Sequence, residues 1–383
     1  MQRLFLLLAA LVLGLYGIPA APANGHRPAL KASWSHVQLA QVAADTAGDL
    51  TPGPWRAVAH VALLLPLKSA DFANAAEMVR QGFLVAAESG GRPPFPIRVY
   101  ATQADTASIL TAYEDAIRNG AAVVVGPLTR DGVGTLAASG RVSVPTLALN
   151  TIDAPAATLP RELYLFGLSV EGEARQIARL AFTPERPRAF VISSDTALAR
   201  RLHEAFVRAW IATGGSVAGE FFPLDGGPEA WTALRRHASA PDAIVFLALE
   251  HDKARLIRPY LDPAMPVFAT SLVYAGADDP VGNFDLNGVR FVDMPWLLTP
   301  DHPAVMTYPR PALPVSADLE RLYALGIDAY RLSLEIARLP APGTVHLDGV
   351  CGDLRLNEDR QFERTLVSAQ FAGGQVRVLR RLP

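Results

Sequence analysis

The stretch VAHVALLL at residues 58–65 is apolar at every position except His60, and Pro66 follows it directly. A short run that is apolar throughout predicts a strand buried on both faces of its sheet, because a strand with one solvent-exposed face would alternate with polar residues. Apolar residues then recur at helical spacing across residues 70–88. A buried strand followed by a helix is the repeating unit of a parallel sheet covered by helices.

The same alternation continues along the chain and then restarts. Further strands are expected at 97–100, 121–125 and 144–149, with helices at 106–119 and 131–139. After a link at 163–169, the next strands are expected at 189–193, 216–222, 243–249 and 267–271, again separated by helices. Two such units in series predict an α/β protein with two doubly wound parallel-sheet lobes joined by a hinge.

These elements suggest four parts in the chain. We expect a signal peptide at 1–23, a flexible tether at 24–56, a first lobe at 57–168 plus about 297–340, and a second lobe with hinge strands at 169–296 plus about 341–383. The late helix at 317–339 and the strand region at 352–379 are too small for a third domain. We therefore expect both segments to complete the two sheets already present.

The first residues have the pattern of a secretory signal. Met1–Arg3 is a short positive start, Leu4–Ile18 is apolar, and Ala21–Ala23 supplies small residues for cleavage. Because the apolar run is shorter than the roughly 20 residues of a spanning helix, a cleaved signal is favoured over an uncleaved anchor. We expect a mature start near Asn24 and a periplasmic location. The single cysteine, Cys351, lies far from the cleavage site, so lipid anchoring is not expected.

The composition and motifs argue against several classes of function. The formal net charge of −2 does not favour nucleic acid as a partner. The glycines of Gly132–Ala137 resemble a dinucleotide fingerprint, but they do not lie at a strand-to-helix turn. The histidines are too scattered for a metal site, and His346 near Cys351 in sequence is weak evidence for a catalytic pair. We therefore expect no enzyme activity, no metal and no cofactor.

What remains are polar residues where the expected strands end, which is where open parallel sheets bind ligands. The candidate ligand-binding residues are Lys68, Ser69, Thr102, Thr129, Asn150, Ser169, Ser194, Asp195, Glu250 and Ser271. Helix starts beside them offer unpaired N–H groups that suit a carboxylate or another anion. Ser, Thr and Asp are also the preferred caps of helices, so the sequence leaves a purely structural role open for each residue.

Most of the chain resembles one known family. The segments that carry the resemblance are Ala62–Leu67, Val124–Thr129, Val144–Asn150, Phe166–Ser169 with Glu171 and Glu173, Phe268–Ser271, Gly288–Phe291, Asp293–Trp296 and Leu322–Leu332. Together they are similar to the carboxy-terminal domain of the penicillin-binding protein activators, the LppC/LpoA group. The wider superfamily has the type I periplasmic binding protein fold. We expect Asp293–Trp296 to end a strand near the hinge, with Trp296 buried.

The resemblance implies a function and a partner. Proteins of this group are envelope regulators that bind a class A penicillin-binding protein and stimulate its peptidoglycan synthesis. The alternative is a periplasmic receptor that closes its cleft on an amino acid or a similar small molecule. The two differ in whether the cleft holds a ligand, for which the residues alone give no evidence.

Overall fold

The computed structural model describes residues 58–379, except for residue 92 and the segments 153–155, 223–228, 230, 233, 235–239, 277–279 and 339–344. The expected signal peptide at 1–23 and tether at 24–56 lie outside the described residues. No helix among the residues described is long and apolar enough to cross a bilayer.

The first sheet has five strands, all parallel, in the order β2-β1-β3-β4-β5. The strands are β1 (His60–Leu65), β2 (Ile97–Ala101), β3 (Ala121–Val125), β4 (Thr146–Ala148) and β5 (Leu163–Leu165). Every residue of β1 is buried, which confirms the prediction made from its apolar run. Residues 163–165 were expected in a link, but they pair with β4 as a fifth strand because all three side chains are buried.

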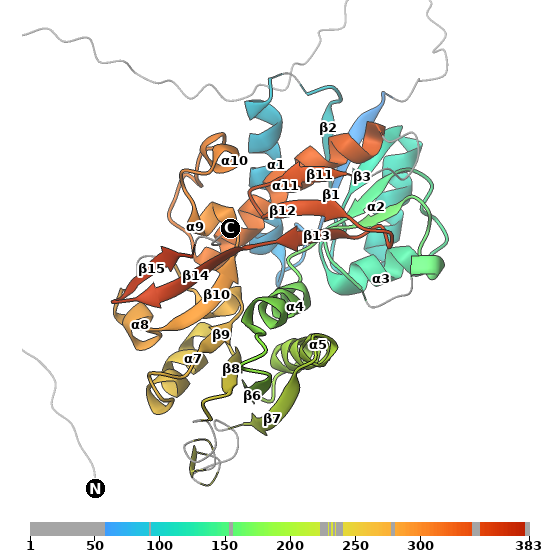
Figure 1. Ribbon diagram of the computed structural model, residues 1–383. Helices are drawn as coiled ribbons and strands as arrows, with labels where there is room; N and C mark the ends of the chain where they lie inside the picture. The colour runs from blue at the N-terminus through green and yellow to red at the C-terminus, as the bar shows by residue number, and fades with distance from the viewer. Residues whose placement is uncertain are drawn as a thin grey trace, which may run out of the picture. The chain divides into compact units, whose positions relative to one another are not determined.

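Helices α1 (Ala73–Ser89), α2 (Thr106–Arg118), α3 (Arg130–Ala138) and α11 (Ala317–Arg338) accompany this sheet. Figure 1 shows α1 and α11 side by side. Their close approach depends on glycine, because a Cβ atom at Gly82 would lie 1.9 Å from the Tyr323 carbonyl oxygen and one at Gly326 would lie 2.1 Å from that of Val79. Two backbones can meet at this distance only where side chains are absent.

The second sheet has seven strands in the order β15-β14-β10-β9-β8-β6-β7. They are β6 (Arg188–Ser193), β7 (Ser216–Phe221), β8 (Ala243–Ala248), β9 (Val267–Ala269), β10 (Val289–Asp293), β14 (Val367–Ala372) and β15 (Gln375–Val378). Strands β6 to β10 are parallel, and β14 and β15 add to them as an antiparallel hairpin.

Both faces of the second sheet carry helices (Figure 1). Helices α4 (Val170–Ala181) and α5 (Ala197–Ala212) pack on one face, and α7 (His251–Ile257) and α8 (Pro280–Asp285) lie on the other. The two doubly wound sheets confirm the expected α/β class. The lobe boundaries near 168, 296 and 340 stay a prediction.

The carboxy-terminal strand region divides in a way that the sequence did not indicate. Only β14 and β15 join a large sheet, whereas β11 (His346–Asp348), β12 (Asp353–Leu356) and β13 (Phe362–Thr365) form a separate antiparallel sheet. A tight turn in which Arg360 has a φ of 55° joins β12 to β13. Such a turn lets β12 and β13 pair with each other, so their backbone hydrogen bonds are made without joining either large sheet.

Strand β10 ends at Asp293, and the short helix α9 (Pro295–Leu298) follows it. Trp296 is fully buried, and its indole N–H donates to a Glu320 carboxylate oxygen at 3.0 Å. Its backbone N–H donates to the Val350 carbonyl at 3.0 Å. The prediction of a strand end followed by a buried tryptophan is therefore confirmed.

The contact between α1 and α11 gives a testable prediction. Gly326→Ala forces the two backbones apart, so we expect it to lower the free energy of unfolding by about 2 kcal/mol or more. The matched control is Gly134→Ala on α3, where a Cβ atom would meet nothing within 4 Å. The control should be neutral or slightly stabilising, because alanine favours helix over glycine. Equal denaturant midpoints for the two variants would contradict the close packing.

Candidate functional site

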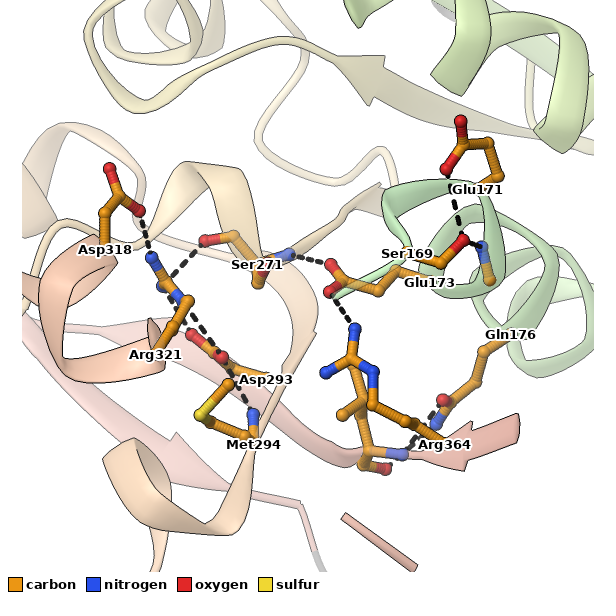
Figure 2. A network of polar contacts seen from close by, with 12 residues as sticks. Ser169, Glu171, Glu173, Gln176, Ser271, Asp293, Met294, Asp318, Arg321 and Arg364 are labelled. Atoms are coloured by element: carbon orange, nitrogen blue, oxygen red, sulfur yellow. Dashed lines mark hydrogen bonds and ion pairs between the residues drawn. The ribbon is translucent and has the colours of Figure 1, made fainter. Parts of the chain in front are cut away.

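The carboxyl end of β10 holds a buried network of charged side chains (Figure 2). Arg321 of α11 is 6% exposed and forms an ion pair with Asp293 at 2.6 Å. The same guanidinium donates to the carbonyl oxygens of Ser271 at 3.1 Å and Tyr274 at 2.8 Å. It also donates to Asp318 at 2.6 Å. A rigid planar fork with five donors suits this arrangement of acceptors, which the single ammonium of lysine could not satisfy.

The charge of Arg321 is well compensated. Burial by itself lowers the pKa of Arg321, but attraction to Asp293 and its neighbours outweighs it, and the net shift is upward. The guanidinium is therefore a permanent cation. Asp293 is 1% exposed, so water could not solvate either charge if the other were removed.

Glu173 forms the second half of the network. It lies in the first turn of α4, is 5% exposed, and accepts a hydrogen bond from the Ser271 backbone N–H at 3.0 Å. Its other oxygen accepts from Arg364 at 3.0 Å. Burial raises the pKa of Glu173, and the positive charge of Arg364 opposes that rise. Ser271 thus links Arg321 and Glu173 through its own carbonyl and N–H groups (Figure 2).

Gln176 extends the network toward the carboxy-terminal strands. Its side-chain amide donates to the Leu366 carbonyl at 2.9 Å and accepts from the Leu366 N–H at 3.0 Å. The amide therefore occupies the place that a neighbouring strand would take. Together these contacts join α11, which packs on the first lobe, to the loop after β9, to β10 and to α4.

A second charged contact crosses between the lobes. Glu171 of α4 accepts from Arg130 of the first-lobe helix α3 at 3.5 Å, and it lies 3.4 Å from Arg201 of α5. The Ser169 hydroxyl donates to the same carboxylate at 3.1 Å. The side chain of Glu171 is 16% exposed, so solvent screens these pairs less than it screens fully exposed ones.

A cavity of about 420 Å³ lies at the carboxyl end of the first sheet. Its walls are mainly apolar, with Phe72, Leu168 and Leu322 among them, and its polar groups come from Thr129–Asp131 and Asn150. The volume and the mixed lining are those of a small-molecule pocket. The same cavity could also receive a side chain of a partner protein.

Thr129 and Asn150 are the two predicted ligand residues that line this cavity, and both already serve the backbone. Thr129 caps α3 by accepting from the Gly132 N–H at 3.2 Å. The Asn150 amide donates to the Leu128 carbonyl at 3.0 Å and accepts from the Thr151 N–H at 2.9 Å. The structural role that the sequence left open is therefore filled at both positions.

The remaining first-lobe candidates lie on neighbouring loops. The Lys68 backbone N–H donates to the Thr102 carbonyl at 2.9 Å, while the Lys68 side chain is exposed. Ser69 and Thr102 are buried. Ser169, the first residue of the expected second lobe, caps α4 by accepting from the Gly172 N–H at 3.1 Å.

The second-lobe candidates do not converge with the first-lobe ones. Lys253 lies 3.4 Å from the Ser194 hydroxyl and 3.5 Å from the Glu250 carboxylate, so it joins those two residues. Asp195 pairs with Arg200 instead. Ser271 belongs to the buried network. Ligand binding by the ten predicted residues stays a prediction.

The weakly indicated catalytic pair is not formed. His346 pairs with Asp353 on the neighbouring strand, whereas Cys351 is fully buried. Burial raises the pKa of the Cys351 thiol well above its usual value, as does the nearby Asp328. A thiol held neutral in this way is a poor nucleophile. Within the described ranges, no three acidic, histidine or cysteine side chains gather as a metal site would require.

The sequence reasoning missed the residues that dominate the junction between the lobes. They are Glu173, Asp293, Arg321 and Arg364. A signal was present in the sequence, because Arg321 directly precedes the apolar segment Leu322–Ile327. A charge beside such an apolar segment needs a buried partner of opposite charge.

Comparison of the sequence with protein families gives one match. Residues 54–225 and 234–374 match the family described as "LppC putative lipoprotein". A relative from Dickeya chrysanthemi, named penicillin-binding protein activator LpoA, is 28% identical over 341 residues, which cover 76% of this chain and 48% of the relative. A Vibrio cholerae relative of the same name is 27% identical, with 81% and 56% covered. The chain spans about half the length of these relatives.

Two of the solved structures with a similar fold each match most of this chain. The carboxy-terminal domain of LpoA from Haemophilus influenzae, described as a regulator of PBP1A, is 22% identical with a TM-score of 0.69, covering 84% of this chain and 100% of that one. A Chromobacterium violaceum protein described as a "putative branched-chain amino acid ABC transporter" is 40% identical with a TM-score of 0.67, covering 82% and 99%. These matches confirm the two-lobed type I periplasmic binding protein fold.

The buried ion pair gives a second testable prediction. Arg321→Met leaves the Asp293 carboxylate buried without its partner, so we expect the free energy of unfolding to fall by about 3–5 kcal/mol. Arg321→Lys should recover only part of this loss. The control is Arg188→Met, which breaks a half-exposed pair with Asp242 and should cost less than about 1 kcal/mol. Denaturant unfolding measures all three variants, and similar losses for Arg321→Met and Arg188→Met would show that the buried pair is unimportant.

Proposed function

We propose that this chain, which belongs to the LppC family, is an envelope regulator that binds a class A penicillin-binding protein and stimulates its peptidoglycan synthesis. The observation that carries the proposal is the family match, which spans both lobes and includes all four charged residues of the buried network. The relatives from Dickeya chrysanthemi and Vibrio cholerae are named as activators of a penicillin-binding protein, which supports a regulatory role and not an enzymatic one.

The geometry supports a role in which the protein presents a surface to its partner. A solute receptor of this fold closes its lobes around a ligand, so its lobes must move relative to each other. Here the Glu171 contacts to Arg130 and Arg201 and the buried Arg321 network tie elements of both lobes together. Such ties favour a fixed arrangement of the lobes, which a partner protein can recognise.

We also infer that the protein works in the periplasm. The inference rests on the apolar run Leu4–Ile18 and the small residues at Ala21–Ala23. The family description includes the word lipoprotein, whereas no cysteine lies near the expected cleavage site of this chain. The inferred periplasmic location holds with or without a lipid anchor.

The solute receptor is the second candidate, and one observation favours it. The cavity of about 420 Å³ in the first lobe is large enough for an amino acid. The Chromobacterium violaceum protein, which is 40% identical, is described as belonging to a transporter for such solutes. Against this, Thr129 and Asn150 are engaged with the backbone of the cavity wall.

A reconstituted synthase assay tests the main proposal. The chain from residue 24 onward is added to a purified class A penicillin-binding protein from the same host, and binding and the transglycosylase and transpeptidase rates are measured. We expect a direct complex and a faster rate of at least one of the two reactions. Heat-unfolded chain is the control and should do neither. If no synthase of the host binds the folded chain, the proposal is wrong.

Calorimetry separates the two candidates. Titration of the folded chain with leucine, isoleucine and valine should give no binding heat, because the Thr129 and Asn150 side chains in the cavity wall already have backbone partners. Binding of any of these amino acids with a micromolar dissociation constant would instead support the receptor.

A further inference from the structure

A row of polar side chains crosses one face of the second sheet. Arg290 on β10 is the register partner of Gln370 on β14, and Gln370 is the partner of Arg377 on β15. Side chains of directly paired residues lie on the same face of a sheet, so the three stand side by side across neighbouring strands. Both arginines are exposed, and Gln370 is half-buried.

A groove begins at this row. It is a cavity of about 420 Å³ lined by Arg290 and Gln370 on one side and by Thr183 and Arg186, just beyond the end of α4, on the other. The groove lies at the amino ends of strands β8 to β10, since Pro266 and Gly288 immediately precede two of them. It is therefore at the opposite end of the sheet from Asp293 and the buried network.

The groove is basic and its cations are unpaired. None of the described residues that line it is acidic. Across the described part of the chain, Arg186, Arg290 and Arg377 have no carboxylate within the 4.0 Å of an ion pair. Asp262 lies outside the groove: it lines a smaller cavity next to Arg186 and accepts a hydrogen bond from the Ala264 N–H at 2.8 Å.

Two of these side chains are held in place before any partner arrives. The Arg290 guanidinium lies over the ring of Phe268, 5.7 Å from its centre. The Gln370 amide donates to the Gly288 carbonyl at 3.1 Å. Side chains that are already ordered lose less conformational entropy on binding, so their contribution to affinity is larger.

We propose that this basic groove, with Arg186, Arg290 and Gln370 in its wall and Arg377 beside Gln370 on β15, docks an acidic segment of the penicillin-binding protein. The inference rests on the proposed function and names the surface that performs it. Neighbouring strands are about 4.8 Å apart, so Arg290 and Arg377 are separated by roughly 10 Å. Carboxylates about three residues apart on an extended peptide, which rises roughly 3.3 Å per residue, match such a spacing.

The charge of the whole chain argues against the other anionic partners. A formal net charge of −2 gives the protein as a whole no electrostatic attraction to an anionic bilayer or to nucleic acid. Because the positive charge is confined to one groove, it favours a partner whose negative charge is confined to a short segment over one with an extended anionic surface. An acidic segment of a folded protein has this property.

The test uses paired charge reversals and the whole chain. Arg290→Glu/Arg377→Glu places like charges against the acidic segment, so we expect the dissociation constant for the synthase to rise at least about tenfold. The matched control is Arg98→Glu/Arg208→Glu, two exposed arginines on β2 and α5 without an ion pair among the described residues. It changes the net charge equally and should stay within about twofold of wild type. Thermal melting confirms folding, and Arg290→Gln/Arg377→Gln replaces the reversal if that variant melts early.

Salt dependence gives an independent measurement. Affinity of the wild-type chain should fall as salt rises, and the groove variant should lose most of that slope while the control keeps it. Unchanged binding of the groove variant, in a chain that still stimulates the synthase, would overturn the groove and leave the proposed function intact. Failure of the wild-type chain to bind any synthase would overturn both. A third outcome is that the wild-type chain sediments with phosphatidylglycerol vesicles and the groove variant does not, while both bind the synthase equally well. That outcome would show that the groove binds membranes instead.

Discussion

The buried positive charge of Arg321 is the constraint on which the junction between the lobes depends. A guanidinium that is 6% exposed must have its charge and its donors satisfied by fixed groups, because water cannot reach it. Asp293 supplies the buried counter-charge, and the Ser271 and Tyr274 carbonyls and Asp318 accept further hydrogen bonds. These acceptors lie at the end of β10 and in the loop after β9, whereas Arg321 lies on a helix packed against the first lobe. Satisfying one side chain therefore fixes the position of three elements.

That constraint bears directly on the kind of function the protein has. Glu173 and Arg364 repeat the same arrangement beside it, and Ser271 joins the two pairs through its backbone. Removing Arg321, Glu173 or Arg364 would leave its partner buried without a counter-charge, so these pairs favour one fixed arrangement of the elements. Lobes tied in this way are suited to presenting a surface of fixed shape. The basic groove on the second sheet is such a surface, and it lies at the far end of that sheet from the network.

The charged residues at the junction and those at the groove have different roles. Charged pairs at the junction are buried and mutually compensated, so they present little field to solvent. Arg290 and Arg377 are exposed and form no ion pair among the described residues, so their field extends outward for about one Debye length, roughly 8 Å in physiological salt. The net charge of −2 does not show this difference, because it adds the paired charges of the junction to the exposed charges of the groove.

The sequence by itself determined the fold class. Apolar runs such as residues 58–65 and the helical spacing after them are local patterns, and hydrophobic burial acts on them in the same way wherever they fold. The burial of Trp296 and the end of β10 at Asp293 followed from the family resemblance. The tertiary structure alone decided which polar residues meet. Thr129 and Ser169 cap helices, Asp195 pairs with Arg200, and Arg321 finds Asp293 across 28 residues of sequence. Which side chains become partners depends on how the packed helices and strands bring them together in space. A local sequence pattern contains no information about that arrangement.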